Sequence, residues 1–250
     1  LKVKKIMFYK TTKTAIVTLM LIAISQTAIA SPISISDVFN NWTKGASIIG
    51  NSTAGSWVLS GNSITGTGNH RGSLISDVSL NTDFSFSVNS IARDDDAFGL
   101  LWGFQDTNNH YRLTWAQQWG ESGVGSSTQG SEGIFDGFKI IKESNGISSI
   151  LYSSDTEYVR NHNYDISVLG TSNGFALSVK NLTNNTDIFN QSITDTTFQS
   201  GKIGIHENYQ NNGNAWSNFN VTTSVPEPSS LAIFSLVIIG LASRRMKKSA

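Results

Sequence analysis

Residues 164–179 read YDISVLGTSNGFALSV, and this stretch decides the class of the fold. Apolar side chains occupy every second position on both sides of a Ser-Asn-Gly turn at residues 172–174. Alternation with a period of two, divided by turn residues, is typical of paired β-strands with one buried face. The stretch therefore predicts a β-hairpin with strands near 164–168 and 175–179.

The same alternation recurs outward from this hairpin, and no stretch shows a sustained helical period. Further alternating segments are 84–88, 111–115, 138–140, 203–205 and 216–221. Candidate turns lie at 106–109, 145–146 and 211–213. With no internal repeat and no linker, residues 31–223 are predicted to form one all-β domain, a two-sheet jelly-roll sandwich. Because the first and last strands of a jelly roll lie close together, we expect segment 38–42 to pack near 216–221.

The charges are segregated along the 250-residue chain, although its net charge is zero. Between Ser31 and Thr223 there are nine basic against 17 acidic residues, whereas both ends are basic. An acidic middle argues against nucleic acid and favours cations or neutral partners. The chain has no cysteine, which excludes disulfides, thiolate metal sites and cysteine nucleophiles.

The first 30 residues have the pattern of a secretory signal peptide. Lysines between Lys2 and Lys13 precede an apolar run at 14–24, and Ala28 and Ala30 place small residues where signal peptidase reads them. We expect cleavage after Ala30, so that the mature protein starts at Ser31. The alternative is an N-terminal membrane anchor, for which the apolar run is short.

Residues 224–250 form a second targeting segment. Val-Pro-Glu-Pro at 225–228 precedes an apolar helix predicted at 231–243, and an Arg/Lys cluster follows at 244–248. The apolar run is only a marginal membrane span by length. The basic cluster would stay in the cytoplasm, which places everything before it outside the membrane.

These three elements in order resemble the PEP-CTERM sorting signal of Gram-negative bacteria that make exopolysaccharide. The resemblance implies a membrane exosortase that cuts near Pro226, Glu227 and Pro228. It also implies transient inner-membrane anchoring followed by a cell-surface or extracellular location. A plain C-terminal anchor is the alternative.

Asp94, Asp95 and Asp96 are the strongest candidate metal ligands. Three adjacent carboxylates raise one another's pKa unless a cation or solvent screens them. If the segment is extended, Asp94 and Asp96 share a face, and carboxylates with backbone carbonyls and waters suit calcium. The spacing is not that of an EF-hand loop. The alternative is a solvated acidic turn before an apolar strand.

The segment 93–105, RDDDAFGLLWGFQ, followed by YRLTW at 111–115, resembles the thrombospondin C-terminal domain. That domain is a concanavalin-A-like, legume-lectin-like jelly roll. The resemblance spans roughly 39–221, but segment 117–133 departs in length and composition. It implies calcium near the triple Asp, and adhesion in place of catalysis.

Other residues carry weaker signals. Asp155 and Glu157 could serve glycoside hydrolysis as a carboxylate pair, but the usual acidic strand of glycosidases on this fold is missing. The four histidines are scattered, and we expect surface or partner-satisfied side chains. Trp42, Trp102, Trp115 and Trp216 lie among apolar strand residues and are expected in the core. Trp119, in a polar glycine-flanked loop, is the candidate for an exposed ligand contact.

The sequence thus predicts a non-enzymatic, calcium-binding adhesion or binding protein of the cell surface or extracellular matrix. Its expected partners are signal peptidase, an exosortase and extracellular polysaccharide or a surface protein, with no nucleic acid. The alternatives are a secreted polysaccharide hydrolase on the same fold and a purely structural matrix component.

Overall fold

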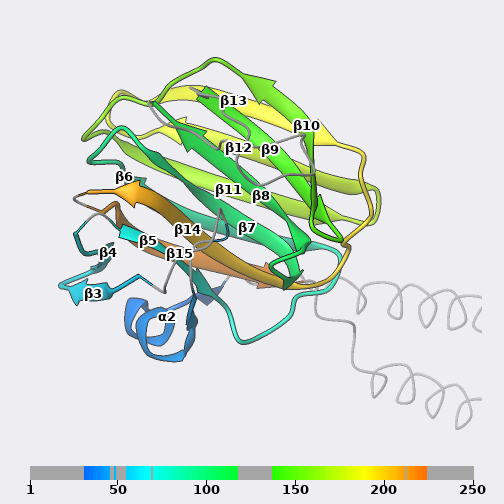
Figure 1. Ribbon diagram of the computed structural model, residues 1–250, viewed down its shortest axis with the longest axis horizontal. Helices are drawn as coiled ribbons and strands as arrows, with labels where there is room; N and C mark the ends of the chain where they lie inside the picture. Colours follow the sequence, from blue (N-terminus) through cyan, green and yellow to red (C-terminus); the bar gives the residue numbers. More distant parts are fainter. Residues whose placement is uncertain are drawn as a thin grey trace, which may run out of the picture.

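The computed structural model describes residues 31–45, 48, 55–68, 70–117, 137–211 and 213–223. Within them the chain folds into two antiparallel β-sheets that pack face to face (Figure 1). The predicted all-β sandwich is therefore confirmed. The predicted signal peptide at 1–30 and the apolar helix at 231–243 lie outside the described residues. None of the described helices is long and apolar enough to cross a membrane.

One layer is an eight-stranded sheet with the order β13-β12-β11-β6-β15-β4-β3, in which β1 also pairs with β15. Its strands are β1 (Ser31–Pro32), β3 (Trp57–Ser60), β4 (Ser63–Gly66), β6 (Phe84–Ile91), β11 (Asn163–Thr171), β12 (Gly174–Asn181), β13 (Thr186–Ile193) and β15 (Ala215–Thr223). The hairpin expected from residues 164–179 is β11 and β12, joined at the predicted turn.

The other layer is a seven-stranded sheet with the order β10-β9-β8-β7-β14-β5-β2. Its strands are β2 (Thr43–Gly45), β5 (His70–Ile75), β7 (Ala97–Asp106), β8 (Asn109–Ala116), β9 (Gly137–Ser144), β10 (Ile147–Ser154) and β14 (Lys202–Gln210). Apart from segment 38–42, the segments predicted as strands all lie within one of the two sheets.

The core forms between the inner faces of the two sheets because alternate apolar residues point inward. In β6, buried Phe84, Phe86 and Val88 alternate with half-buried polar residues. Trp115 lies at the centre, with its ring centroid 4.9 Å from that of Tyr164. Burial of each large apolar side chain contributes roughly 1.5–3 kcal/mol to the stability of the fold. Trp42, Trp102, Trp115 and Trp216 are all buried, which confirms their expected place in the core.

The segment expected to hold the first strand is instead a short helix, α2 (Ile35–Asn41). The Ser34 hydroxyl caps it by accepting the Asp37 backbone N–H at 3.1 Å, and the Asp37 carboxylate adds a favourable charge in the first turn. The expected proximity is still confirmed, because Trp42 packs edge-on against Phe219 of β15 with ring centroids 5.6 Å apart.

The two ends of β15 mark the two ends of the sandwich. At its start Ala215 pairs with Ile91 of β6, and at its end Thr223 pairs with Phe84. Ser31, the predicted mature N-terminus, pairs with Val221. Ser31 and Thr223 therefore lie together at one end, and the turn that follows Ile91 lies at the other. We call the turn of residues 94–96 the Asp rim.

Candidate functional site

The Asp rim connects the last residues of β6 in one sheet to the first residue of β7 in the other. Asp94, Asp95 and Asp96 are half-buried there, and one carboxylate oxygen from each lies within 4.8 Å of the others. Because a connection between sheets must bend sharply, the segment is not extended. The assumption that Asp94 and Asp96 share a face while Asp95 points away is therefore wrong, and all three carboxylates converge.

Two side chains from distant segments fix the backbone of the rim. The hydroxyl of buried Tyr158 lies 2.8 Å from the Asp94 carbonyl oxygen and 2.7 Å from that of Asp96, and donates its proton toward them. Burial raises the pKa of Tyr158, so the hydroxyl stays a donor at all physiological pH values. The Gln210 side-chain amide also donates to the Asp96 carbonyl oxygen.

The three carboxylates have different surroundings. Asp94 accepts the backbone N–H of Asn211 at 2.7 Å, and Asp95 forms an ion pair with Arg160 at 2.7 Å. The Asp96 carboxylate has no hydrogen-bond partner among the described residues. Burial first, and then the charges of Asp94 and Asp95, raise the pKa of Asp96 to about 7. At neutral pH this carboxyl is thus partly protonated and would give up its proton to a cation.

The donor set fits calcium, a hard cation that takes oxygen ligands. Three carboxylates, offset in part by the guanidinium groups of Arg160 and Arg71, leave the rim negatively charged when all three are ionised, which favours a cation. The fully buried Gln210 adds a second indication, because its Oε1 atom has no hydrogen-bond partner within the described residues and is bonded to the same amide group that reaches Asp96. Asp94 and Asp96 could hold the ion, with Asp95 partly engaged by Arg160.

The remaining candidates do not converge with the rim. Asp155 and Glu157 are both exposed on the connection between β10 and β11. Trp119 and the processing residues Ala28, Ala30, Pro226, Glu227 and Pro228 lie outside the described residues, so their roles stay predictions. Of the histidines, His110 and His206 are fully buried, and burial lowers the pKa of each to about 3.

Sequence reasoning missed Glu207, which is fully buried beneath the start of β15. Its Oε1 atom accepts the Trp216 indole N–H and, at 3.0 Å, the Asn214 backbone N–H. Burial raises the pKa of this carboxyl to about 8, so it is protonated near neutral pH. A signal was present in the sequence, because the alternation of Ile203 and Ile205 continues to position 207.

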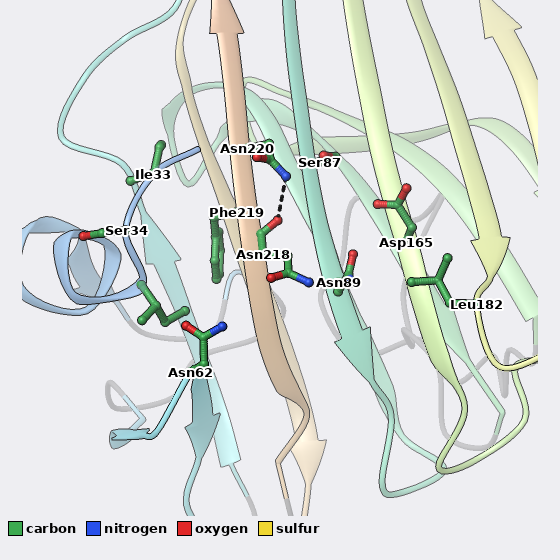
Figure 2. Close-up of a pocket in the computed structure, with 11 residues that line it drawn as sticks. Ile33, Ser34, Asn62, Ser87, Asn89, Asp165, Leu182, Asn218, Phe219 and Asn220 are labelled. Atoms are coloured by element: carbon green, nitrogen blue, oxygen red, sulfur yellow. Dashed lines mark hydrogen bonds between the residues drawn. The ribbon is translucent and has the colours of Figure 1, made fainter. Parts of the chain in front are cut away.

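It also missed a groove of about 500 Å³ on the outer face of the eight-stranded sheet. Figure 2 shows Asn89 of β6, Asp165 of β11 and Asn218 of β15 on three adjacent strands, with the segment that leads into α2 along one side. The alternation at 164–168 did assign Asp165 to the outer face of its strand. Nothing in the sequence indicated that Asn89 and Asn218 lie beside it, since asparagines in this chain read as turn formers.

The tail and the sandwich each have known counterparts. Residues 224–248 carry a PEP-CTERM protein-sorting motif. The PEP-CTERM motif confirms the predicted sorting signal and implies an exported protein of the cell envelope or the extracellular space. Among curated protein sequences, none matches this chain.

Solved structures resemble the sandwich at low identity. A Bacillus subtilis protein of unknown function with a galectin-like fold aligns with a TM-score of 0.54 at 11% identity, over 80% of this chain and 97% of its own. The carbohydrate-binding module CBM66 from Bacillus subtilis aligns with a TM-score of 0.51 at 15% identity, over 73% and 98%. The exoplasmic/lumenal domain of VIP36 in its Ca²⁺-bound form aligns with a TM-score of 0.51 at 12% identity, over 74% and 91%. These similarities show a lectin-like fold, and the finer resemblance to the thrombospondin domain stays a prediction.

Proposed function

We propose that this chain is an exported, exosortase-processed protein of the cell surface or extracellular matrix that binds calcium at the Asp rim and adheres to exopolysaccharide. The observation that carries the calcium site is the convergence of three half-buried carboxylates around Asp96, whose pKa is raised to about 7. The sorting motif supports the location. The carbohydrate-binding module with the same fold supports a saccharide as the ligand class.

Binding fits the described residues better than hydrolysis does. Glycosidases of the common type need two carboxyl groups that flank the bond to be cut. Asp155 and Glu157 are both exposed, and neither lines the groove. One oxygen from each of the three carboxylates of the rim lies within 4.8 Å of the others, so the three can share one ion. Calcium, when bound, would neutralise the rim and fix the connection between the two sheets.

Calcium should stabilise the protein by mass action. We expect a higher melting temperature in calcium than in chelator, corresponding to about 2.7 kcal/mol at a hundredfold excess over the dissociation constant. Asp94→Asn and Asp96→Asn should each remove most of this shift, while Asp95→Asn should remove less, because Arg160 already engages Asp95. The measurement is a thermal melt of the full chain in both conditions.

Asp155→Asn is the matched control, because it removes an exposed aspartate elsewhere and should leave the calcium shift unchanged. Equal melting temperatures in calcium and chelator would show that the rim is only an acidic turn. A shift that survives both Asp94→Asn and Asp96→Asn would place the ion elsewhere.

A further inference from the structure

The groove on the outer face of the eight-stranded sheet is built by an irregularity in β15. Ser217 pairs with Asn89 and Asn220 pairs with Ser87, so two residues of β15 face one residue of β6. The extra residue makes a β-bulge, and Asn218 there has a φ of +53°. A bulge re-aims side chains that regular alternation would place elsewhere. It sends Phe219 into the core and leaves Asn218 on the outer face, next to Asn220.

The groove is lined by amide and carboxylate side chains that can hydrogen-bond to a ligand. Asn89 of β6 is directly opposite Asp165 of β11 in the sheet, which places an amide beside a carboxylate. Within the described part of the chain, the side chains of Asn89, Asp165 and Asn218 have no hydrogen-bond partner. Only Asn220 is engaged, since its amide donates to the Asn218 carbonyl oxygen at 3.1 Å (Figure 2).

The charge and polarity of the lining indicate the class of ligand. Among the described residues that line the groove, Asp165 is the only charged side chain. Lys180 lies opposite Asp165 on β12, outside the lining, and offsets part of its charge, so the lining itself offers no cation to an anionic ligand. Asparagine amides both donate and accept hydrogen bonds, and a carboxylate accepts them, which is the combination that neighbouring hydroxyl groups require. The partly exposed Leu182 and Ile35 add apolar contacts for the C–H groups of a ring. The volume lies within the range of about 300–1,000 Å³ that is common for small-molecule sites.

We propose that this groove is a saccharide subsite that binds a pyranose unit of a neutral polysaccharide through Asn89, Asp165 and Asn218. This assignment rests on the polysaccharide-binding function proposed above. It gives that function a place on the molecule and a ligand class. The subsite lies on the outer face of the eight-stranded sheet, separate from the Asp rim. Saccharide binding therefore does not need a calcium ion as a direct ligand of the sugar.

Calorimetric titration of the full chain, in a detergent that contains no sugar, tests this assignment. The probes are the neutral oligosaccharides maltohexaose, cellohexaose and mannohexaose, and the anionic hexagalacturonate. We expect at least one neutral oligosaccharide to bind, and hexagalacturonate to bind at least tenfold more weakly. Asn89→Ala and Asp165→Asn should each weaken the neutral ligand at least tenfold.

Two controls keep folding and binding apart. Asn218→Gly removes the amide but keeps a residue that adopts a positive φ freely, so it should weaken binding without loss of stability. Asn190→Ala removes an exposed asparagine on β13, outside the groove, and should leave the affinity unchanged. Each variant is accepted for comparison when its calcium-dependent melting shift equals that of the wild type.

The outcomes separate the subsite from the function on which it rests. Neutral oligosaccharides that bind the groove variants as tightly as the wild type would overturn the subsite. The subsite would also be overturned if Asp94→Asn or chelator abolished oligosaccharide binding while the groove variants left it intact. Polysaccharide adhesion itself would then stand. If none of the four oligosaccharides binds while calcium still stabilises the fold, the subsite fails and the calcium site survives.

Discussion

Glu207 is a carboxyl group in an apolar interior, and its protonation state links the fold to pH. The unfolded chain would release this proton near the ordinary value of 4.5, whereas the folded protein keeps it until about pH 8. Between these values the folded state binds more protons than the unfolded state. The contribution of Glu207 to stability must therefore fall as the pH rises from about 4.5 to about 8.

Replacing Glu207 with Gln should remove this dependence, since the amide oxygen can still accept the Trp216 and Asn214 N–H groups. We compare the free energy of unfolding of the Glu207→Gln variant with that of the wild type. The difference should shift in favour of the variant by at least about 1 kcal/mol as the pH rises from 5 to 8. Urea unfolding of both proteins at pH 5 and pH 8 measures these free energies of unfolding. The lowered pKa values of His110 and His206 act equally on both proteins and cancel. Parallel stability profiles would show that Glu207 is ionised in the fold.

Among single residues, the sequence pointed to the three aspartates of the Asp rim but not to the side chains that hydrogen-bond to the backbone of the rim. Tyr158 and Gln210 contact a segment that lies roughly 60 to 115 positions earlier in the chain. Such pairs come from the order of strands in two sheets, which no local pattern encodes. The asparagines of the groove were missed for a different reason, because their residue type signals turns whenever the partner strand is unknown.

Among the elements, the strands with clear apolar alternation were predicted, whereas the edge strands and the interior strands β4 and β5 were not. The strands that were foreseen bury one or both faces, so their apolar residues alternate clearly. β10 and β13 lie at the edges of their sheets and are largely half-buried or exposed, which weakens the alternation. The helix α2 was hidden by its length, since seven residues hold too few turns to show a helical period.

The β9–β10 hairpin offers a test of turn chemistry at an edge. Asn145 and Gly146 have φ values of +53° and +75°, as a two-residue turn with two left-handed residues requires. Gly146→Ala should destabilise the protein by about 1–2 kcal/mol through the backbone alone, because the nearest atom to the new Cβ would be 3.6 Å away. Urea unfolding measures the change. Asn145→Gly, which keeps the conformation accessible, should cost less, and equal losses would contradict this origin.

For the whole molecule, processing at both ends is the central prediction. We expect the exported protein to begin at Ser31 and to lack the tail beyond residues 226–228 in a host with exosortase. Intact mass spectrometry of the surface or secreted form measures both ends at once. A form that still contains Leu231 to Ala250 would instead indicate a permanent anchor. A form that keeps residues 1–30 would indicate an N-terminal anchor.

The pairing of Ser31 with Val221 sets how the molecule is presented to its surroundings. Ser31 and Thr223, the described residues nearest to the two predicted cutting points, lie at one end of the sandwich, so a chain tethered by its tail would be attached at that end. The strand β15 then runs away from the tether over nine residues, about 30 Å at 3.3 Å per residue, before the Asp rim is reached. A calcium ion bound as proposed would therefore lie at the end of the sandwich opposite the tail, and tail removal would leave the Asp rim undisturbed.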